Sequence, residues 1–212
     1  MLLATRDAPE TTGRSRRQAQ GRAAILAAAA RAFAARGLHG TTIDDIARET
    51  GFAPSSLYRY FPSKHDLHLA LLDATADEML APFADPLLPT LKFRERLEWL
   101  LRRQLATIEQ HRESFVVFAS QRAAVERDDS QTGSGGPKSA YERWVTALED
   151  VLEVGVNDGS LRALNPRDMA YFVAGALNTT VFRWMRGKLP QPLQAYVPTL
   201  MGMILRGVQV ER

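Results

Sequence analysis

The sequence predicts an all-α protein of about nine helices, and three observations support this fold class. Apolar residues recur three and four positions apart along almost the whole chain, which places them on one face of a helix. The breaks in this pattern fall at prolines, glycines and helix-capping residues. No segment alternates convincingly in the manner of a strand. With 212 residues, of which 45% are hydrophobic, the chain can bury a real core in one large domain or two small ones.

The first two helices are expected over residues 17–36 and 43–50. Gly37 ends the first, and Thr42 is the N-cap of the second. Asp45 stands three residues after Thr42, so the pair reads as a capping box with Asp in place of the usual Glu. Gly51 ends the second helix, because glycine adopts the left-handed C′ conformation without a side-chain penalty. The inner stripe of the first helix consists of Ile25, Leu26, Ala29 and Phe33.

A third helix is expected over residues 54–61, with Pro54 in its first turn and an end at Pro62. A fourth follows over residues 63–80. Ser63 caps it, with Asp66 three residues later. We expect His68 to face solvent beside the buried face of this helix, which consists of Leu67, Ala70, Leu71 and Ala74.

Five more amphipathic helices are expected in the remaining sequence. Residues 128–137, DDSQTGSGGP, separate the second of them from the third and predict a mobile loop. The third ends near residues 157–159. Asn165 caps the fourth, which closes at Gly187, and the last helix ends the chain. Their apolar stripes include Phe93, Leu97, Leu100, Leu101, Ile108, Val125, Tyr141, Val145, Leu148, Leu152, Met169, Val173, Val197, Met201 and Val208.

The charge of the chain is unevenly distributed. Residues 1–64 hold nine Arg and one Lys against three Asp and two Glu, a net charge of +5, whereas residues 65–212 carry −2. A basic N-terminal third on a nearly neutral body indicates an anionic partner for that third. A merely solvated surface remains the alternative on charge alone.

The helices over 43–50 and 54–61 are joined by a tight turn, Gly51-Phe52-Ala53, as in a helix-turn-helix whose second helix enters a major groove. Hydroxyl groups of Ser and Tyr suit phosphate oxygens, and Arg59 can donate two hydrogen bonds to guanine. We expect Lys64, at the start of the next helix, to contact a phosphate. Ordinary packing of a short amphipathic helix stays the alternative for this segment taken alone. The candidate DNA-binding residues are Thr42, Ala53, Ser55, Ser56, Tyr58, Arg59, Tyr60 and Lys64.

The segment from Gly40 to Leu67 strongly resembles the DNA-binding part of the tetracycline-repressor (TetR) family of bacterial transcription regulators. The resemblance covers residues 17 to about 72, and the rest of the chain fits in helix count and length. The family often has Ser or Gly where this chain has Pro54 and Ser55, and often His in place of Tyr60, which obscures the operator sequence. The matching positions are Gly40, Thr42, Ile46, Ala47, Gly51, Leu57, Tyr58, Tyr60, Phe61, Lys64 and Leu67.

The resemblance implies a homodimeric repressor on a near-palindromic double-stranded DNA operator, released by a small effector. Residues 1–16 would be a flexible basic tail, 17–65 the DNA-binding domain, and 66–212 the effector-binding and dimerisation domain. The helix over 63–80 would link the two domains as a lever. The last two helices would form the dimer interface, through Val181, Trp184, Leu200, Ile204 and Leu205.

Polar groups stand among aromatic residues in the C-terminal helices, which is the composition of a small-molecule cavity. Ordinary core packing is the alternative for these aromatic residues. We expect a mostly apolar or aromatic effector, and the candidate pocket residues are Trp99, Gln104, Phe115, Phe118, Arg122, Trp144, Phe172 and Asn178.

Other chemistries find little support in the sequence. The chain has no cysteine, which excludes thiol nucleophiles and iron–sulfur clusters, and no nucleophile or phosphate-loop motif, so we expect neither an enzyme nor a cofactor. His65 and His68 lack a third ligand nearby, so no metal site is expected. No signal-peptide core or membrane-length apolar run is present, which favours a soluble, cytoplasmic protein. An effector-independent architectural DNA-binding dimer, and a helical ligand carrier or enzyme, remain the alternative functions.

Overall fold

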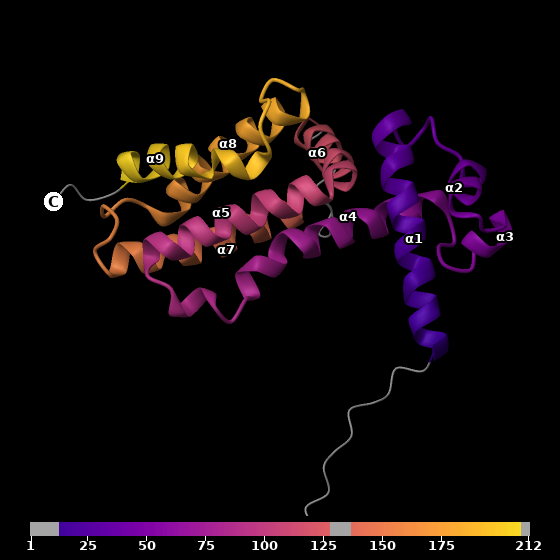
Figure 1. The fold of residues 1–212 in the computed structure, drawn as a ribbon, viewed down its shortest axis with the longest axis horizontal. Coiled ribbons are helices and arrows are strands. Elements are labelled where there is room, and N and C mark those ends of the chain that lie inside the picture. The colour runs from indigo at the N-terminus through magenta and orange to yellow at the C-terminus, as the bar shows by residue number, and fades with distance from the viewer. Residues whose placement is uncertain (1–12, 128–136, 209–212) are drawn as a thin grey trace, which may run out of the picture. The chain divides into compact units, whose positions relative to one another are not determined.

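The computed structural model describes residues 13–127 and 137–208, and these residues form helices joined by turns and short connections (Figure 1). The chain divides into two compact units, one ending at Leu71 and the other beginning at Leu72. The division falls inside one continuous helix, α4 (Lys64–Leu80). The predicted all-α class with nine α-helices is confirmed for the described residues.

The first unit is built on α1 (Gly13–Arg36), which packs against α2 (Ile43–Thr50), and α2 packs against the short helix α3 (Pro54–Leu57). Helix α1 begins before residue 17, so residues 13–16 are helical rather than part of a flexible tail. Arg and Gln near this end are good helix formers, and no proline interrupts the segment. The expectation for residues 1–12 lies outside the described residues. The core of the unit includes Ile25, Ala28, Ala29, Phe33, Ile46, Ala47, Leu57, Phe61, Leu67 and Leu71.

Helix α3 is shorter than the predicted range of 54–61. After Leu57 the chain continues in tight turns, in which the amide N–H groups of Tyr60 and Phe61 both donate to the Leu57 carbonyl at 2.9 Å. Phe61 precedes Pro62, and the residue before a proline is disfavoured in the helical region. The helix therefore ends early, while Leu57 and Phe61 still reach the core as predicted.

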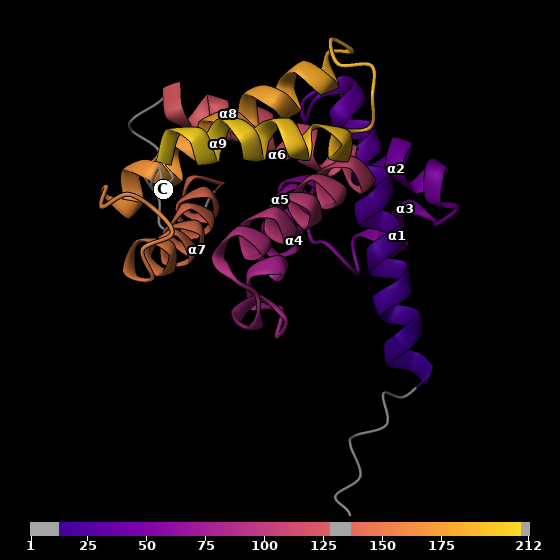
Figure 2. The ribbon, with the colours of Figure 1, turned by 60° about the vertical axis from the view of Figure 1, so that its left-hand side comes forward.

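The second unit contains α5 (Phe93–Gln110), α6 (Arg112–Arg127), α7 (Pro137–Asn157), α8 (Pro166–Met185) and α9 (Val197–Val208). Three 3-10 turns, η1 (Ala81–Ala84), η2 (Leu88–Thr90) and η4 (Leu193–Tyr196), connect them. Helix α7 pairs with α8, α5 contacts α7 and α9, and α8 and α9 lie side by side (Figure 2). Apart from Pro137, which opens α7, the loop expected over 128–137 lies outside the described residues.

The buried face of α4 is wider than the sequence indicated. His68 is 4% exposed and packs edge-on against Phe33, with 5.5 Å between the ring centroids, so the expectation that it faces solvent is wrong. Ala70 and Ala74 are only half-buried. The first part of α4 packs within the first unit and its later part within the second. The buried residues of α4 therefore do not form one narrow apolar stripe. The buried residues of α4 are Leu67, His68, Leu71, Leu72, Thr75 and Ala76.

In the part of the chain that the structure describes, no helix combines the length and the apolar character needed to cross a bilayer.

Candidate DNA-binding surface and ligand cavity

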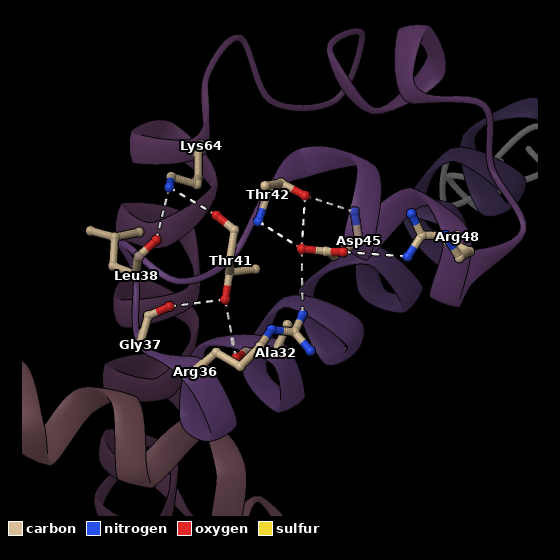
Figure 3. A network of polar contacts seen from close by, with 9 residues as sticks. All are labelled: Ala32, Arg36, Gly37, Leu38, Thr41, Thr42, Asp45, Arg48 and Lys64. Carbon is tan, nitrogen blue, oxygen red and sulfur yellow. Dashed lines mark hydrogen bonds and ion pairs between the residues drawn. The ribbon is translucent and has the colours of Figure 1, made fainter.

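The start of α2 is fixed by the predicted capping box (Figure 3). The Asp45 amide donates to Thr42 Oγ1 at 3.1 Å, and the Thr42 amide donates to Asp45 Oδ2 at 3.1 Å. Hydrogen bonds from Thr42, and then the charges of Arg36 and Arg48, lower the pKa of the Asp45 carboxyl. An anion also complements the positive end of the helix dipole. The box therefore sets where α2 begins and how its first turn is oriented.

A buried hydrogen-bond network anchors the loop between α1 and α2 (Figure 3). Thr41 is fully buried, and its hydroxyl lies 2.9 Å from the Gly37 carbonyl and 3.2 Å from the Ala32 carbonyl. Lys64 Nζ donates to the carbonyl oxygens of Leu38 at 2.8 Å and Thr41 at 2.9 Å. The ammonium group predicted to contact a phosphate thus holds this loop to the start of α4.

At two positions of the helix-turn-helix, the backbone geometry requires glycine. Gly51 has φ 72°, the left-handed conformation that turns the chain from α2 toward α3. At Gly40 a Cβ atom would lie 2.4 Å from the carbonyl oxygen of Arg36, so the close approach of the loop to the end of α1 excludes a side chain.

The predicted DNA-contacting residues are largely exposed. Ala53, Ser55, Arg59 and Thr42 are exposed, and Tyr58 is 52% exposed. Ser56 and Tyr60 are half-buried. The opposite side of the segment carries the buried Leu57 and Phe61, so the segment presents a polar face over a fixed apolar one.

Tyr60 is held against its own unit more firmly than Tyr58. Its ring packs against Phe52 with centroids 6.1 Å apart, and its hydroxyl lies beside Gly21 of α1, where a Cβ atom would be 2.5 Å away. Tyr60 also lines a cleft of about 380 Å³ together with Arg17, Gln18 and Arg59. This cleft joins the first turns of α1 to the end of the α3 segment.

The arginines of the first unit fall into two groups. Arg31 pairs with Glu49, and both Arg36 and Arg48 pair with Asp45. Within the described residues, no ion pair is found for the second group, which consists of Arg16, Arg17, Arg22 and Arg59. In this second group, Arg22 stacks over the Phe61 ring at 5.1 Å. The side chain of Arg14 lies outside the described residues. The uncompensated positive charge therefore sits on α1 and beside α3.

The second unit holds a largely apolar cavity of about 130 Å³ between α4, α5, α6, α7 and α8. Of the eight predicted pocket residues, five line it: Gln104, Phe115, Phe118, Trp144 and Asn178. The remaining lining residues are Met79, Ile108, Ala119, Tyr141, Leu177, Val181 and Phe182.

Two of the other three predicted pocket residues, Trp99 and Phe172, are not among those that line the cavity. Trp99 packs near Leu88 and Leu100 with Arg103 over its ring at 5.5 Å. Phe172 is 54% exposed on the outer side of α8. The side chain of Arg122 lies outside the described residues. Helical spacing could not separate the inner from the outer faces, because both carry aromatic residues.

The walls of the cavity are ordered by aromatic contacts and one buried hydrogen bond. Trp144 stacks on Tyr141, with centroids 6.4 Å apart and an interplanar angle of 17°, and meets Phe83 edge-on at 6.1 Å. The Trp144 indole N–H donates to Gln104 Oε1 at 3.2 Å, and Gln104 is 4% exposed. A polar side chain is thus fixed inside an aromatic cavity.

Four of the predicted dimer residues lie in the core of their own subunit. Val181 and Ile204 are at most 1% exposed, and Leu200 and Leu205 are also buried. Trp184 is half-buried under Arg112, whose guanidinium lies 5.7 Å from its ring. A second apolar surface, missed by the sequence analysis, lies on the outer side of the same helices. We name it the α8/α9 groove, and it is lined by Tyr171, Phe172, Gly175, Ala176, Thr179, Thr180, Arg183, Leu189, Tyr196, Thr199, Leu200 and Met203.

Arg167 joins α8 to α7 next to this groove. It pairs with Glu142 and Glu149, each at 2.8 Å, and the hydrogen bond to Glu149 raises the pKa of its guanidinium. The Tyr171 hydroxyl donates to Glu142 at 3.0 Å, which raises the pKa of Tyr171. These contacts orient Tyr171 and explain its place at the edge of the groove.

Both units match models of a single family. The description "bacterial regulatory proteins, tetR family" applies to residues 25–71, and "tetracyclin repressor-like, C-terminal domain" applies to residues 90–208. The chain belongs to the TetR family. It is therefore a transcriptional regulator rather than an enzyme, and regulators of this family bind DNA operators and small effectors.

Relatives within the TetR family match either nearly the whole chain or its N-terminal part. The HTH-type transcriptional repressor KstR2 of Mycobacterium tuberculosis is 29% identical over 199 residues, which are 90% of this chain and 94% of that protein. The HTH-type transcriptional regulator RutR of Escherichia coli is 43% identical over 79 residues, 37% of each chain. The solved structure of the ketosteroid transcriptional regulator KstR2 of M. tuberculosis has a TM-score of 0.73 at 28% identity, covering 97% of this chain and all of that one.

Metal ions in proteins are held by sets of His, Cys, Asp or Glu ligands. Among the residues of known placement, no group of three or more His, Asp or Glu side chains could hold an ion. His65 is exposed, whereas His68 is buried against Phe33, so the two do not form a common site.

Proposed function

We propose that the protein binds a near-palindromic operator as a homodimer, with residues 17–65 of each subunit on one half-site and residues 66–212 serving effector binding and dimerisation. The observation that carries this proposal is the coincidence of two features. The exposed polar face of α3 and its turn adjoins arginines for which no ion pair is found among the described residues, Arg17 and Arg59 above all. Such a surface offers both groove contacts and phosphate contacts.

Two half-sites are needed for useful selectivity. One short helix reaches only a few base pairs, and each good base contact discriminates by about 1–3 kcal/mol. In this arrangement Arg59 and Ser55 face base edges, while Tyr58, Tyr60 and Arg17 contact phosphates. The arginines on α1 add affinity that does not depend on sequence and falls with salt.

We assign the dimer interface to the α8/α9 groove. Phe172 and Met203 are 54% and 64% exposed and line the same apolar groove, and a contiguous exposed apolar patch is typical of a protein–protein interface. The groove presents small residues between these side chains, Gly175 and Ala176 among them, which allow a partner helix to approach. A twofold-related copy of the same two helices would bury both grooves at once.

We assign effector binding to the cavity beside Trp144. Its size is close to that of the ~150 Å³ apolar cavity that binds benzene, so it accepts a compact apolar molecule or the ring portion of a larger one. KstR2 is a ketosteroid transcriptional regulator, which agrees with an apolar, ring-containing effector. An effector that prefers one orientation of α4 would shift the population away from the DNA-binding state.

A footprint on DNA upstream of the protein's own gene tests the first part of the proposal. We expect two protected half-sites related by a twofold axis, bound by a species whose mass in light scattering is that of at least two subunits. A monomer on a single half-site, or no specific footprint, would overturn it.

A thermal-shift screen of apolar and aromatic compounds tests the second part. Compounds that stabilise the protein are then titrated into the protein–operator complex. We expect them to release the DNA. A compound that occupies the cavity but leaves operator affinity unchanged would favour an effector-independent architectural protein instead.

A further inference from the structure

The orientation of the Gln104 amide inside the cavity is determined by its neighbour. The indole nitrogen of Trp144 carries a hydrogen and can only donate, so the Gln104 atom 3.2 Å away must be the amide oxygen. The NH₂ group of Gln104 is then the free end of the side chain. This nitrogen is buried and finds no hydrogen-bond partner within residues 13–127 and 137–208.

A buried hydrogen-bond donor without a partner lowers the stability of the folded protein. A ligand in the cavity that carries a hydrogen-bond acceptor would satisfy this donor. Gln104 lines the cavity on the same side as Trp144, and Asn178 adds a second amide from α8. The donor is held by α5 and by its bond to α7, so a ligand meets it already oriented.

The remaining walls limit the chemistry of the ligand. None of the described lining residues is Asp, Glu, Lys, Arg or His, so a buried carboxylate or ammonium would find no counter-charge among them. Phe115, Phe118 and Trp144 provide flat apolar contacts. The site therefore suits an apolar body with a neutral hydrogen-bond acceptor.

We infer that Gln104 Nε2 donates a hydrogen bond to a neutral carbonyl oxygen of the effector, so that the cavity selects a carbonyl-bearing ring compound over its hydrocarbon and over a carboxylate. This inference rests on the proposed effector function of the cavity. It adds the class of ligand and the residue that recognises it.

The test uses the full-length protein and three compounds of the same skeleton: 1-indanone, indane and indane-1-carboxylate. Dissociation constants are measured by calorimetry for the wild type and for Gln104→Met, which retains the length of the side chain but not the donor. Ketone and hydrocarbon differ in their affinity for water, so only the change in their affinity ratio between the two proteins is informative.

We expect Gln104→Met to lower the ratio of indanone to indane affinity by about 2- to 12-fold, the range of one hydrogen bond between neutral groups. The matched control is Gln110→Met, the same substitution at an exposed position of α5, which should leave the ratio unchanged. Indane-1-carboxylate should bind the wild type more weakly than indanone.

A second measurement does not require a folded variant. In the wild type, the side-chain amide resonances of Gln104 should shift with indanone much more than with indane, while the Trp144 indole resonance should respond to both compounds.

An unchanged ratio in Gln104→Met, an unresponsive Gln104 amide, or tighter binding of the carboxylate would overturn the inference while leaving an effector cavity in place. Failure of both indanone and indane to perturb Trp144 would overturn the cavity as a site. The inference and the effector part of the proposed function would then fall together.

Discussion

Lys64, the first residue of α4, donates from Nζ to the backbone carbonyl of Thr41, 2.9 Å away, just before α2 begins. The same ammonium donates to the carbonyl of Leu38 at 2.8 Å. A charged side chain thus closes the loop between α1 and α2 onto the start of α4. The position of the helix-turn-helix in its unit depends on this contact as well as on apolar packing.

Lys64→Met should destabilise the first unit by about 1.5–3 kcal/mol, because two part-buried carbonyls lose a charged donor. Operator affinity should fall, yet its dependence on salt should stay as in the wild type, since the residue positions the motif. Urea unfolding and titrations at several salt concentrations measure both effects. Lys92→Met, at an exposed position of the second unit, is the control. A salt slope reduced by about one would instead make Lys64 a phosphate ligand.

Arg59→Ala should relax base preference at one position of each half-site and cost about 1–3 kcal/mol there, as expected for a guanidinium that reads guanine. Arg17→Ala is the matched comparison, because both side chains line the same cleft. It should weaken binding to all sequences alike and lower the salt slope by about one. Competition binding between operator DNA and random DNA measures the loss of affinity for each. Equal losses on both DNAs for Arg59→Ala would show that it contacts only phosphate.

The sequence located both ends of α2 and the start of α4 well, because these depend on nearby residues, whereas it placed the end of α3 too late. Thr42 and Asp45 form the predicted box, and Ser63 accepts from the Asp66 amide at 3.1 Å. The sequence did not predict contacts between residues that are far apart along the chain. Nothing in the local pattern shows that Lys64 turns back to residues 38 and 41, or that His68 meets Phe33, since those contacts exist only after α4 packs on α1.

Phe172→Glu combined with Met203→Glu should convert the proposed dimer to a monomer of nearly unchanged unfolding free energy, because both side chains are exposed in the α8/α9 groove. Operator affinity should drop strongly as the link between half-sites is lost. Leu164→Glu, at a position 46% exposed in the same unit, should remain dimeric. Light scattering and circular dichroism check mass and folding. A double variant that stays dimeric would place the interface elsewhere.

The outer groove could not be distinguished from the core by periodicity. Helix α8 is apolar on two faces: Val173, Leu177 and Val181 are buried, whereas Tyr171 and Phe172 are exposed in the groove. An apolar stripe predicted from the sequence includes the most apolar residues, whether they face the core or the solvent. It therefore selected core positions for the dimer and one surface position, Phe172, for the effector.

Acid should loosen the start of α2 through Asp45. Because hydrogen bonds from Thr42 lower its pKa in the folded protein, the ionised carboxyl stabilises the fold above its unfolded pKa, and this contribution is lost as pH falls through the lower folded value. The protection factors of the α2 amides against hydrogen exchange, corrected for the intrinsic exchange rate at each pH from about 5 downward, should therefore fall below about pH 4. Asp45→Asn should remove that dependence, and Asp44→Asn should retain it. Identical profiles for the wild type and Asp45→Asn would show that the box does not depend on charge.

The linking helix α4 should transmit effector binding only if it is stiff, because it runs without a break across the boundary between Leu71 and Leu72. Gly at both Ala70 and Ala74, which are half-buried, should weaken the helix by about 1 kcal/mol each while removing little packing. Effector affinity should stay nearly normal, since neither position lines the cavity. In the wild type, coupling of typical size would lower operator affinity about 5- to 150-fold, and the double variant should respond less. Ala70→Ser with Ala74→Ser, a milder change at the same positions, is the control. Equal responses in all three proteins would show that the signal does not pass through α4.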